Sequence, residues 1–143
     1  MYLSIVIPAY NEEKRLPKTL VEVGEYLKTK QFEYEVIVVN DGSKDRTVEV
    51  VTRLNIENLR IINNLENHGK GYVVRQGLLE AKGEYRLFMD ADNSTSIKEI
   101  GNFLPHLKKY DIIIGSRIIK GSKITNPQPK SRRILGKLYI FLI

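Results

Sequence analysis

The chain has 143 residues, the usual size of one domain with its own hydrophobic core. It contains no Cys, which excludes disulfide bonds and thiolate metal sites, and its two isolated His argue against a zinc site. The net charge is +6, but seven of the 23 Lys and Arg fall within residues 117–137, which contain no acidic residue, so the remainder has a net charge of −1. No apolar run reaches about 18 residues, the length that suggests a membrane-spanning helix. The first residues lack a signal-peptide pattern, so we expect a cytoplasmic protein.

The order of apolar patterns along the chain predicts the fold class. Five short runs rich in β-branched residues predict strands buried on both faces, because their apolar character is nearly continuous. These runs are residues 3–7, 35–39, 59–62, 85–89 and 111–114. Amphipathic segments alternate with the runs. This alternation predicts an α/β protein with a mostly parallel, Rossmann-like sheet flanked by helices.

The segments between the runs carry helix-start and helix-stop signals. Ser43 or Asp45 is the predicted N-cap of the second helix. The third helix is predicted over residues 70–81, with Gly83 as the C′ residue that ends it. A fourth helix is predicted over residues 97–109, before the last apolar run.

Polar residues follow every predicted strand. Because the carboxyl ends of parallel strands meet at one edge of a sheet, where ligands bind, we expect these residues to form one site. The sequences are Pro-Ala-Tyr-Asn-Glu at 8–12, Asn-Asp-Gly-Ser at 40–43, Asn-His-Gly-Lys-Gly at 67–71, Asp-Ala-Asp at 90–92 and Gly-Ser-Arg at 115–117. No G-x-G-x-x-G follows the first strand and no P-loop motif is present, which argues against dinucleotide redox and P-loop enzymes.

The two carboxylates of Asp90 and Asp92 are separated by Ala91 and follow a predicted buried strand. Carboxylate oxygens suit Mg²⁺ or Mn²⁺, and such ions usually bridge to the phosphates of a substrate. The spacing therefore predicts a metal site that takes a phosphate-bearing ligand.

Two further features have a functional and a purely structural explanation. The carboxylate of Asp41 can accept an N–H from a uracil or guanine base, or Asp41 can belong only to a turn and helix cap. Lys70, flanked by Gly69 and Gly71 at the start of a helix, can attract an anion, or these residues can form a flexible loop with a solvated Lys.

The basic residues near the end of the chain precede an apolar run, residues 138–143. Arg132, Arg133 and Lys137 suit a helix lying on an anionic membrane surface. A nucleic-acid patch is disfavoured because interleaved aromatic residues are nearly absent, and a helix that packs on further protein is the other alternative. We expect one domain over residues 1–120, followed by a basic loop and the start of a helix over residues 121–143.

In combination these segments resemble glycosyltransferase family 2, which has the GT-A nucleotide-sugar-binding fold. The resemblance rests on residues 4–13, 38–43, 69–71, 89–92 and 114–117, in the order and spacing of the family. Within the family, residues 15–20 and 69–77 look most like the dolichyl-phosphate or polyprenyl-phosphate glucosyltransferases. Such relatives continue with an acceptor-binding segment, so we expect this chain to be incomplete at its C-terminal end.

The resemblance implies a role for each matching position. Donor binding falls to eleven residues: Pro8, Ala9, Tyr10, Glu12, Asp41, Gly42, Lys70, Gly71, Asp90, Ala91 and Asp92. Asp90 and Asp92 would hold the metal, and Asp92 and Arg117 would act in catalysis. Arg117, Arg132 and Arg133 would meet the acceptor phosphate at the cytoplasmic face of a membrane. Asn40 stands where many relatives have Asp, so it receives no role that depends on charge.

The implied reaction is an inverting transfer of a sugar, with glucose favoured, from a nucleoside diphosphate sugar to a polyprenyl or dolichyl phosphate. An anionic acceptor needs no strong general base, which agrees with the lack of an obvious base in this chain. A base in a missing C-terminal part is the other explanation. One alternative is a non-catalytic module that binds the nucleotide sugar or a membrane. A second is a haloacid-dehalogenase-like phosphohydrolase, suggested by residues 90–95 but disfavoured because no later acidic pair is present.

Overall fold

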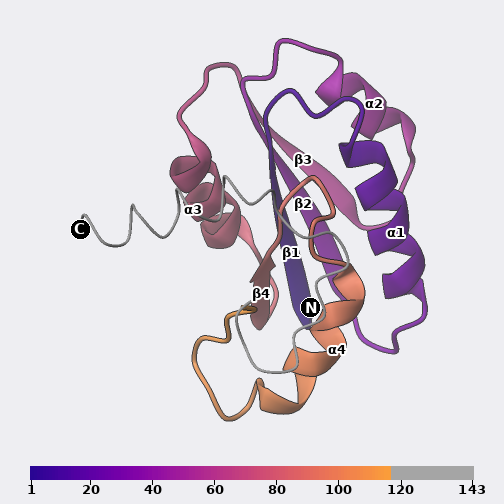
Figure 1. The fold of residues 1–143 in the computed structure, drawn as a ribbon, viewed down its shortest axis with the longest axis vertical. Helices are drawn as coiled ribbons and strands as arrows, with labels where there is room; N and C mark the ends of the chain where they lie inside the picture. The colour runs from indigo at the N-terminus through magenta and orange to yellow at the C-terminus, as the bar shows by residue number, and fades with distance from the viewer. Residues whose placement is uncertain (117–143) are drawn as a thin grey trace, which may run out of the picture. The chain divides into compact units, whose positions relative to one another are not determined.

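The computed structural model describes residues 1–116. Residues Met1–Lys109 form one compact unit, built on a four-stranded sheet in the order β3-β2-β1-β4. All neighbouring strands run parallel, as predicted (Figure 1). The strands are β1 (Leu3–Ala9), β2 (Tyr34–Asp41), β3 (Leu59–Asn64) and β4 (Tyr85–Phe88).

Burial differs between the central and the edge strands of this sheet. β1 is almost entirely buried and β2 is buried along its whole length, because helices cover both faces. β3 is half-buried, and in β4 exposed residues alternate with half-buried ones, so that Phe88 is 40% exposed. The prediction of burial on both faces is therefore correct for the two central strands and wrong for β3 and β4, which lie at the two edges of the sheet.

The helices form one layer on each side of the sheet. The helices are α1 (Leu16–Lys28), α2 (Thr47–Arg53), α3 (Lys70–Glu80) and α4 (Ile100–Phe103). Figure 1 shows α1 and α2 on one side of the sheet and α3 on the other. Ile5 and Ile7 of β1 pack in the core on the α1 side, whereas Val6 packs with Val73 of α3 on the other side. Alternate residues of one strand thus supply both cores.

Glycine and proline account for two errors in the predicted helices. α3 ends at Glu80, so the prediction that Gly83 is its C′ residue is wrong. A Cβ at Gly83 would lie 2.6 Å from the backbone nitrogen of Ser4, so this glycine instead permits close contact with β1. The predicted helix 97–109 consists of a 3₁₀ turn, the four residues of α4 and a second 3₁₀ turn, because Pro105 removes a backbone donor.

Residues 110–116 belong to a second unit and contain no helix or strand. The predicted strand 111–114 is therefore wrong for this structure. An apolar segment needs a hydrogen-bonded neighbour and covered faces to form a strand, and Ile112 is 79% exposed. Within the described residues, no helix has the length and apolarity needed to cross a membrane. The expected boundary at residue 120 lies outside the described residues and stays a prediction.

Candidate functional site

A cleft of about 450 Å³ opens within the first unit, at the carboxyl ends of the strands. Nine of the eleven residues expected to bind a donor line it, and Gly42 and Gly71 do not. The lining residues are Pro8, Ala9, Tyr10, Glu12, Asp41, Asn67, Gly69, Lys70, Val73, Asp90, Ala91 and Asp92. The sequence assigned no role to Val73, which lines the cleft because it faces the sheet from the first turns of α3.

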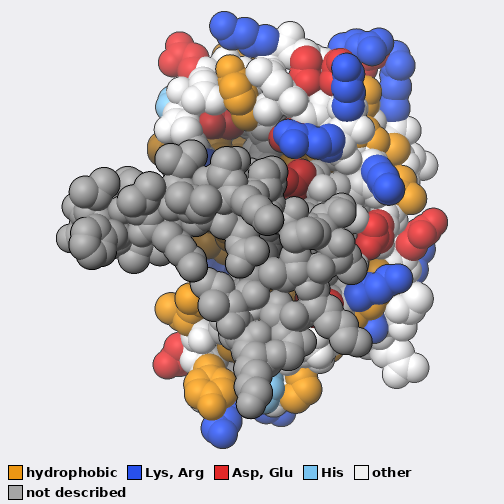
Figure 2. Space-filling model, viewed as in Figure 1, with side chains coloured by type: hydrophobic (Ala, Val, Ile, Leu, Met, Phe, Trp, Pro, Cys, Tyr) orange, Lys and Arg blue, Asp and Glu red, His pale blue; other side chains and the backbone are white. Residues whose placement is uncertain are grey.

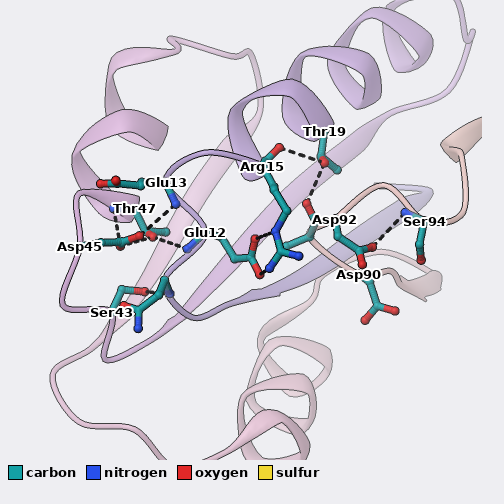
Figure 3. Close-up of polar contacts among 12 residues, drawn as sticks. Glu12, Glu13, Arg15, Thr19, Ser43, Asp45, Thr47, Asp90, Asp92 and Ser94 are labelled. Carbon is teal, nitrogen blue, oxygen red and sulfur yellow. Dashed lines mark hydrogen bonds and ion pairs between the residues drawn. The ribbon is translucent and has the colours of Figure 1, made fainter. Parts of the chain in front are cut away.

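The acidic loop, residues 90–92, continues directly from β4 into this cleft. Figure 3 shows the carboxylates of Asp90 and Asp92 projecting from the loop. Ala91, which separates them in the sequence, is buried. One carboxylate oxygen of Asp92 accepts the backbone N–H of Ser94 at 2.9 Å. The ammonium of Lys70, at the first residue of α3, lies 2.5 Å from Oδ1 of Asp90. The predicted metal-binding and anion-binding residues therefore meet in one place.

Helix α1 fixes the position of the acidic loop. The buried hydroxyl of Thr19 donates to the backbone carbonyl of Ala91 at 2.7 Å. Glu22, one turn further on, accepts from the Asn93 amide at 2.6 Å and from the Ser96 hydroxyl at 2.8 Å. The Ser96 hydroxyl and then the Asn93 amide hold the pKa of Glu22 below its usual value. Sequence reasoning missed these contacts because they join residues more than 70 positions apart.

The side chain of Asp41 binds the loop that leads into α3. Its side chain is only 3% exposed, and its two carboxylate oxygens accept the backbone N–H groups of His68 (2.8 Å) and Gly69 (3.0 Å). The carboxylate therefore holds the loop that leads into α3 and does not cap α2. Asp41 still lines the cleft, and each carboxylate oxygen has a further lone pair, so the predicted contact with a nucleotide base stays a prediction.

The loop after β1 is tied to the start of α2, as Figure 3 shows. The backbone N–H of Glu12 donates to the Thr47 hydroxyl at 2.8 Å, and that of Glu13 donates to Asp45 at 3.1 Å. The N-cap residue of α2 is Arg46, so the prediction of Ser43 or Asp45 at that position is wrong. Asp45 lies one residue earlier and accepts the backbone N–H of Thr47, the first residue of the helix. Burial raises the pKa of Asp45, but these hydrogen bonds outweigh burial and lower it overall. The wall of the cleft at Tyr10 to Glu12 is thus anchored.

Arg15 is a charged neighbour of the acidic loop that the sequence did not single out. Its guanidinium forms two hydrogen bonds with Glu12, which lines the cleft. The hydrogen bond to Glu12 and then the charge of Glu12 raise the pKa of Arg15, and the charge of Asp92 adds to this. The i, i+3 spacing of Glu12 and Arg15 was the available signal.

Gly42 and Gly71 lie beside the cleft for different reasons. Gly42 has a φ of +70°, and a Cβ there would lie 2.5 Å from the backbone carbon of Glu66. It is needed where the loop after β2 crosses the loop after β3. Gly71 lies in the first turn of α3, which contains no acidic residue and no side-chain cap. The first turn of α3 therefore places no acidic side chain of its own at the positive end of the helix dipole, and the carboxylate held nearby is that of Asp41, on the N–H of Gly69.

The chemistry of the acidic loop fits a divalent metal. Among residues 1–116 no group of three His, Cys, Asp or Glu residues is placed to hold a metal ion. Mg²⁺ and Mn²⁺ do not require such a cage, since one or two carboxylates combined with substrate phosphates and water suffice. The predicted ligands Asp90 and Asp92 meet this requirement.

The predicted acceptor residues Arg117, Arg132 and Arg133 lie outside the described residues, as does Lys137. In the described part, acidic and basic side chains are interspersed on the face shown in Figure 2. The roles of these arginines stay predictions.

Sequence comparison identifies the family. The family model described as "Glycosyl transferase family 2" matches residues 4–142. The chain belongs to glycosyl transferase family 2. The predicted resemblance is therefore confirmed, and the family assignment removes the basis for the phosphohydrolase alternative.

Curated relatives within family 2 share a more specific name. A dolichyl-phosphate beta-glucosyltransferase of Trichomonas vaginalis is 41% identical over 95% of this chain and 46% of its own length. The Homo sapiens dolichyl-phosphate beta-glucosyltransferase is 42% identical over 68% of this chain and 33% of its own length. The chain spans about half the length, or less, of the curated relatives it matches.

Solved structures of similar fold include complexes with nucleotide sugars. S. aureus TarS in complex with UDP-GlcNAc is 28% identical, with a TM-score of 0.64, over 76% of this chain and 32% of its own. A Pyrobaculum calidifontis mannosyltransferase in complex with GDP-Man and Mn²⁺ is 27% identical, with a TM-score of 0.56, over 63% of this chain and 27% of its own. The predicted GT-A fold of this family 2 chain is thus confirmed.

Proposed function

We propose that this chain carries the donor site of a metal-dependent, inverting glucosyltransferase. The donor is a nucleoside diphosphate glucose, and the acceptor is dolichyl phosphate or a similar polyprenyl phosphate. The observation that carries the proposal is the cleft in which the acidic loop, Lys70 and the start of α3 converge. The names of the curated relatives support glucose and dolichyl phosphate, and the solved complexes support a nucleotide sugar and a divalent ion.

Different residues of the cleft are proposed to bind the diphosphate and the base of the donor. Asp90 and Asp92 would hold Mg²⁺ or Mn²⁺, which neutralises charge on a departing diphosphate. Lys70 and the start of α3 supply further positive potential for that diphosphate. Tyr10, which is half-exposed, offers a ring for base stacking, and Asp41 offers a carboxylate to a base N–H.

The acceptor side of the reaction needs little from the described residues. A phosphate monoester is already anionic near neutral pH, so the attacking oxygen does not require a strong general base. Arg117, Arg132 and Arg133 are proposed to contact the acceptor phosphate. Because that lipid lies in a membrane, the protein is proposed to bind at the cytoplasmic membrane surface.

A transfer assay tests the proposed reaction. The protein is incubated with UDP-[¹⁴C]glucose, Mn²⁺ and dolichyl phosphate in detergent, and label is counted in the organic phase. The expected result is Mn²⁺-dependent labelled lipid that EDTA abolishes. If the chain binds the nucleotide sugar but labels no lipid, the alternative of a non-catalytic donor-binding module is correct. If it does neither, the proposed function is wrong.

Glu22 offers a test of how α1 positions the acidic loop. In Glu22→Gln the charge that accepts from both Asn93 and Ser96 is lost, so the loop should sample more positions. We expect the affinity for UDP in the presence of Mn²⁺ to fall about tenfold, as for other groups that orient metal ligands. Calorimetric titration measures this, with Glu25→Gln, an exposed carboxylate of the same helix, as the control. Equal affinities for the two variants would refute the positioning role.

A further inference from the structure

The ammonium of Lys70 occupies the position at Asp90 where a cation is expected. Its Nζ lies 2.5 Å from Oδ1 of Asp90 and 5.3 Å from the centre of the Phe88 ring. Lys70 begins α3, whereas Phe88 ends β4, 18 positions later, and Asp90 begins the acidic loop, 20 positions later. The contact is therefore made across the cleft by the fold and is not a local helix pair.

The carboxylates of Asp90 and Asp92, which are separated by one residue, repel each other, and a nearby cation offsets this repulsion. In the ligand-free protein Lys70 offsets the charge of Asp90. A divalent ion bound to the same carboxylate would repel the ammonium, since like charges a few ångströms apart repel each other even in water. Metal binding therefore displaces Lys70 from Asp90.

The displaced side chain has an obvious second partner. Lys70 lies in the cleft wall, at the end of α3 that attracts anions, and 61% of its side chain is exposed, so it has room to turn. We propose that Lys70 exchanges partners, an inference that rests on the proposed donor site. Lys70 is the counterion of Asp90 in the free protein and pairs with the diphosphate of the donor when the metal ion binds.

The exchange predicts opposite effects on two ligands. An exposed ion pair contributes about 0.2–1 kcal/mol, so Lys70→Met should tighten binding of Mn²⁺ alone by about 1.4- to 5-fold. The same substitution should weaken binding of UDP in the presence of saturating Mn²⁺ by about 5- to 10-fold, because a charge-assisted contact to phosphate is lost. If Lys70 only stabilised the fold, its replacement would weaken the binding of Mn²⁺ alone and also the binding of UDP.

The experiment measures free Mn²⁺ by electron paramagnetic resonance during titration of the protein, first without nucleotide, and then follows UDP by calorimetry. Lys28→Met, an exposed lysine in the last turn of α1, controls for the loss of one positive charge. Lys70→Arg keeps the charge and should stay close to the wild type in both titrations. Unchanged circular dichroism spectra confirm that the variants are folded.

The outcomes separate this proposal from the proposed function. Weaker or unchanged binding of Mn²⁺ alone to Lys70→Met overturns the exchange, whatever happens with UDP. Tighter Mn²⁺ binding with unchanged UDP binding also overturns it, because Lys70 would then have no second partner. If Mn²⁺ binds more tightly to Lys70→Met but the wild type binds no UDP, the proposed donor site is wrong, while Lys70 still competes with the metal.

Discussion

Replacing Asp92 with asparagine is expected to lower the affinity for UDP in the presence of Mn²⁺ by about 100-fold. Asparagine has the same shape and can still accept the backbone N–H of Ser94, so the loop should keep its conformation. It removes one of the two negative ligands of the proposed metal. Loss of groups that merely orient a metal ligand lowers metal affinity 10- to 100-fold. Direct loss of a ligand should therefore lower the affinity by at least about 100-fold.

The matched control for this substitution is Glu80→Gln, which removes one negative charge from an exposed position at the end of α3. Its UDP affinity should stay within about twofold of the wild type, since exposed charges at a distance are screened. Calorimetric titration at saturating Mn²⁺ gives both values. If Asp92→Asn binds UDP as tightly as Glu80→Gln does, the acidic loop is not the metal site.

Replacing Glu35 with alanine is expected to lower the free energy of unfolding by about 3 kcal/mol, as for other broken buried ion pairs. Glu35 lies in the central strand β2 and is only 5% exposed. Its carboxylate accepts the Ser4 hydroxyl at 2.6 Å, the backbone N–H of Lys82 at 2.7 Å and the guanidinium of Arg60 at 3.1 Å. The substitution leaves the buried Ser4 hydroxyl, and the partly buried donors of Lys82 and Arg60, without this acceptor. Urea unfolding measures the change, and Glu57→Ala, at an exposed position, should have little effect.

The same carboxylate predicts how stability depends on pH. Burial raises the pKa of Glu35, but the three donors outweigh burial and leave the pKa below its usual value. A lowered pKa in the folded state means that the stabilisation is present above the ordinary Glu pKa of about 4.3 and is lost as the pH falls through the folded value. The free energy of unfolding of the wild type should therefore fall more steeply with decreasing pH below about pH 4.3 than that of Glu35→Gln. Parallel curves would contradict this role of Glu35.

The order of apolar runs and amphipathic segments along the chain predicted the parallel sheet. It also predicted that the strand ends lie side by side, because a parallel sheet brings its carboxyl ends to one edge. β1 and β2 are apolar without interruption, which requires cover on both faces, and a parallel connection brings their carboxyl ends to one edge. The cleft residues from Pro8 to Asp92 follow from that arrangement. Pro105 was visible in the sequence and could have prevented the prediction of a continuous helix 97–109.

Contacts between loops were not predictable in the same way. The backbone N–H groups that Asp41 accepts lie 27 and 28 positions away, and nothing in the residue types identifies them. Gly83 resembled a helix stop because glycine is common there, yet the approach of Ser4 decides its role. Such features depend on how separate elements cross, which residue order alone does not show.

The cleft is proposed to bind a nucleoside diphosphate sugar through a divalent metal. Calorimetric titration of the protein with UDP-glucose and with GDP-mannose, each with Mn²⁺ and with EDTA, measures this binding. We expect at least one of the two sugar nucleotides to bind with Mn²⁺, and EDTA to abolish that binding. Binding of neither sugar nucleotide, or binding that is the same with Mn²⁺ and with EDTA, would show that the cleft is not such a site.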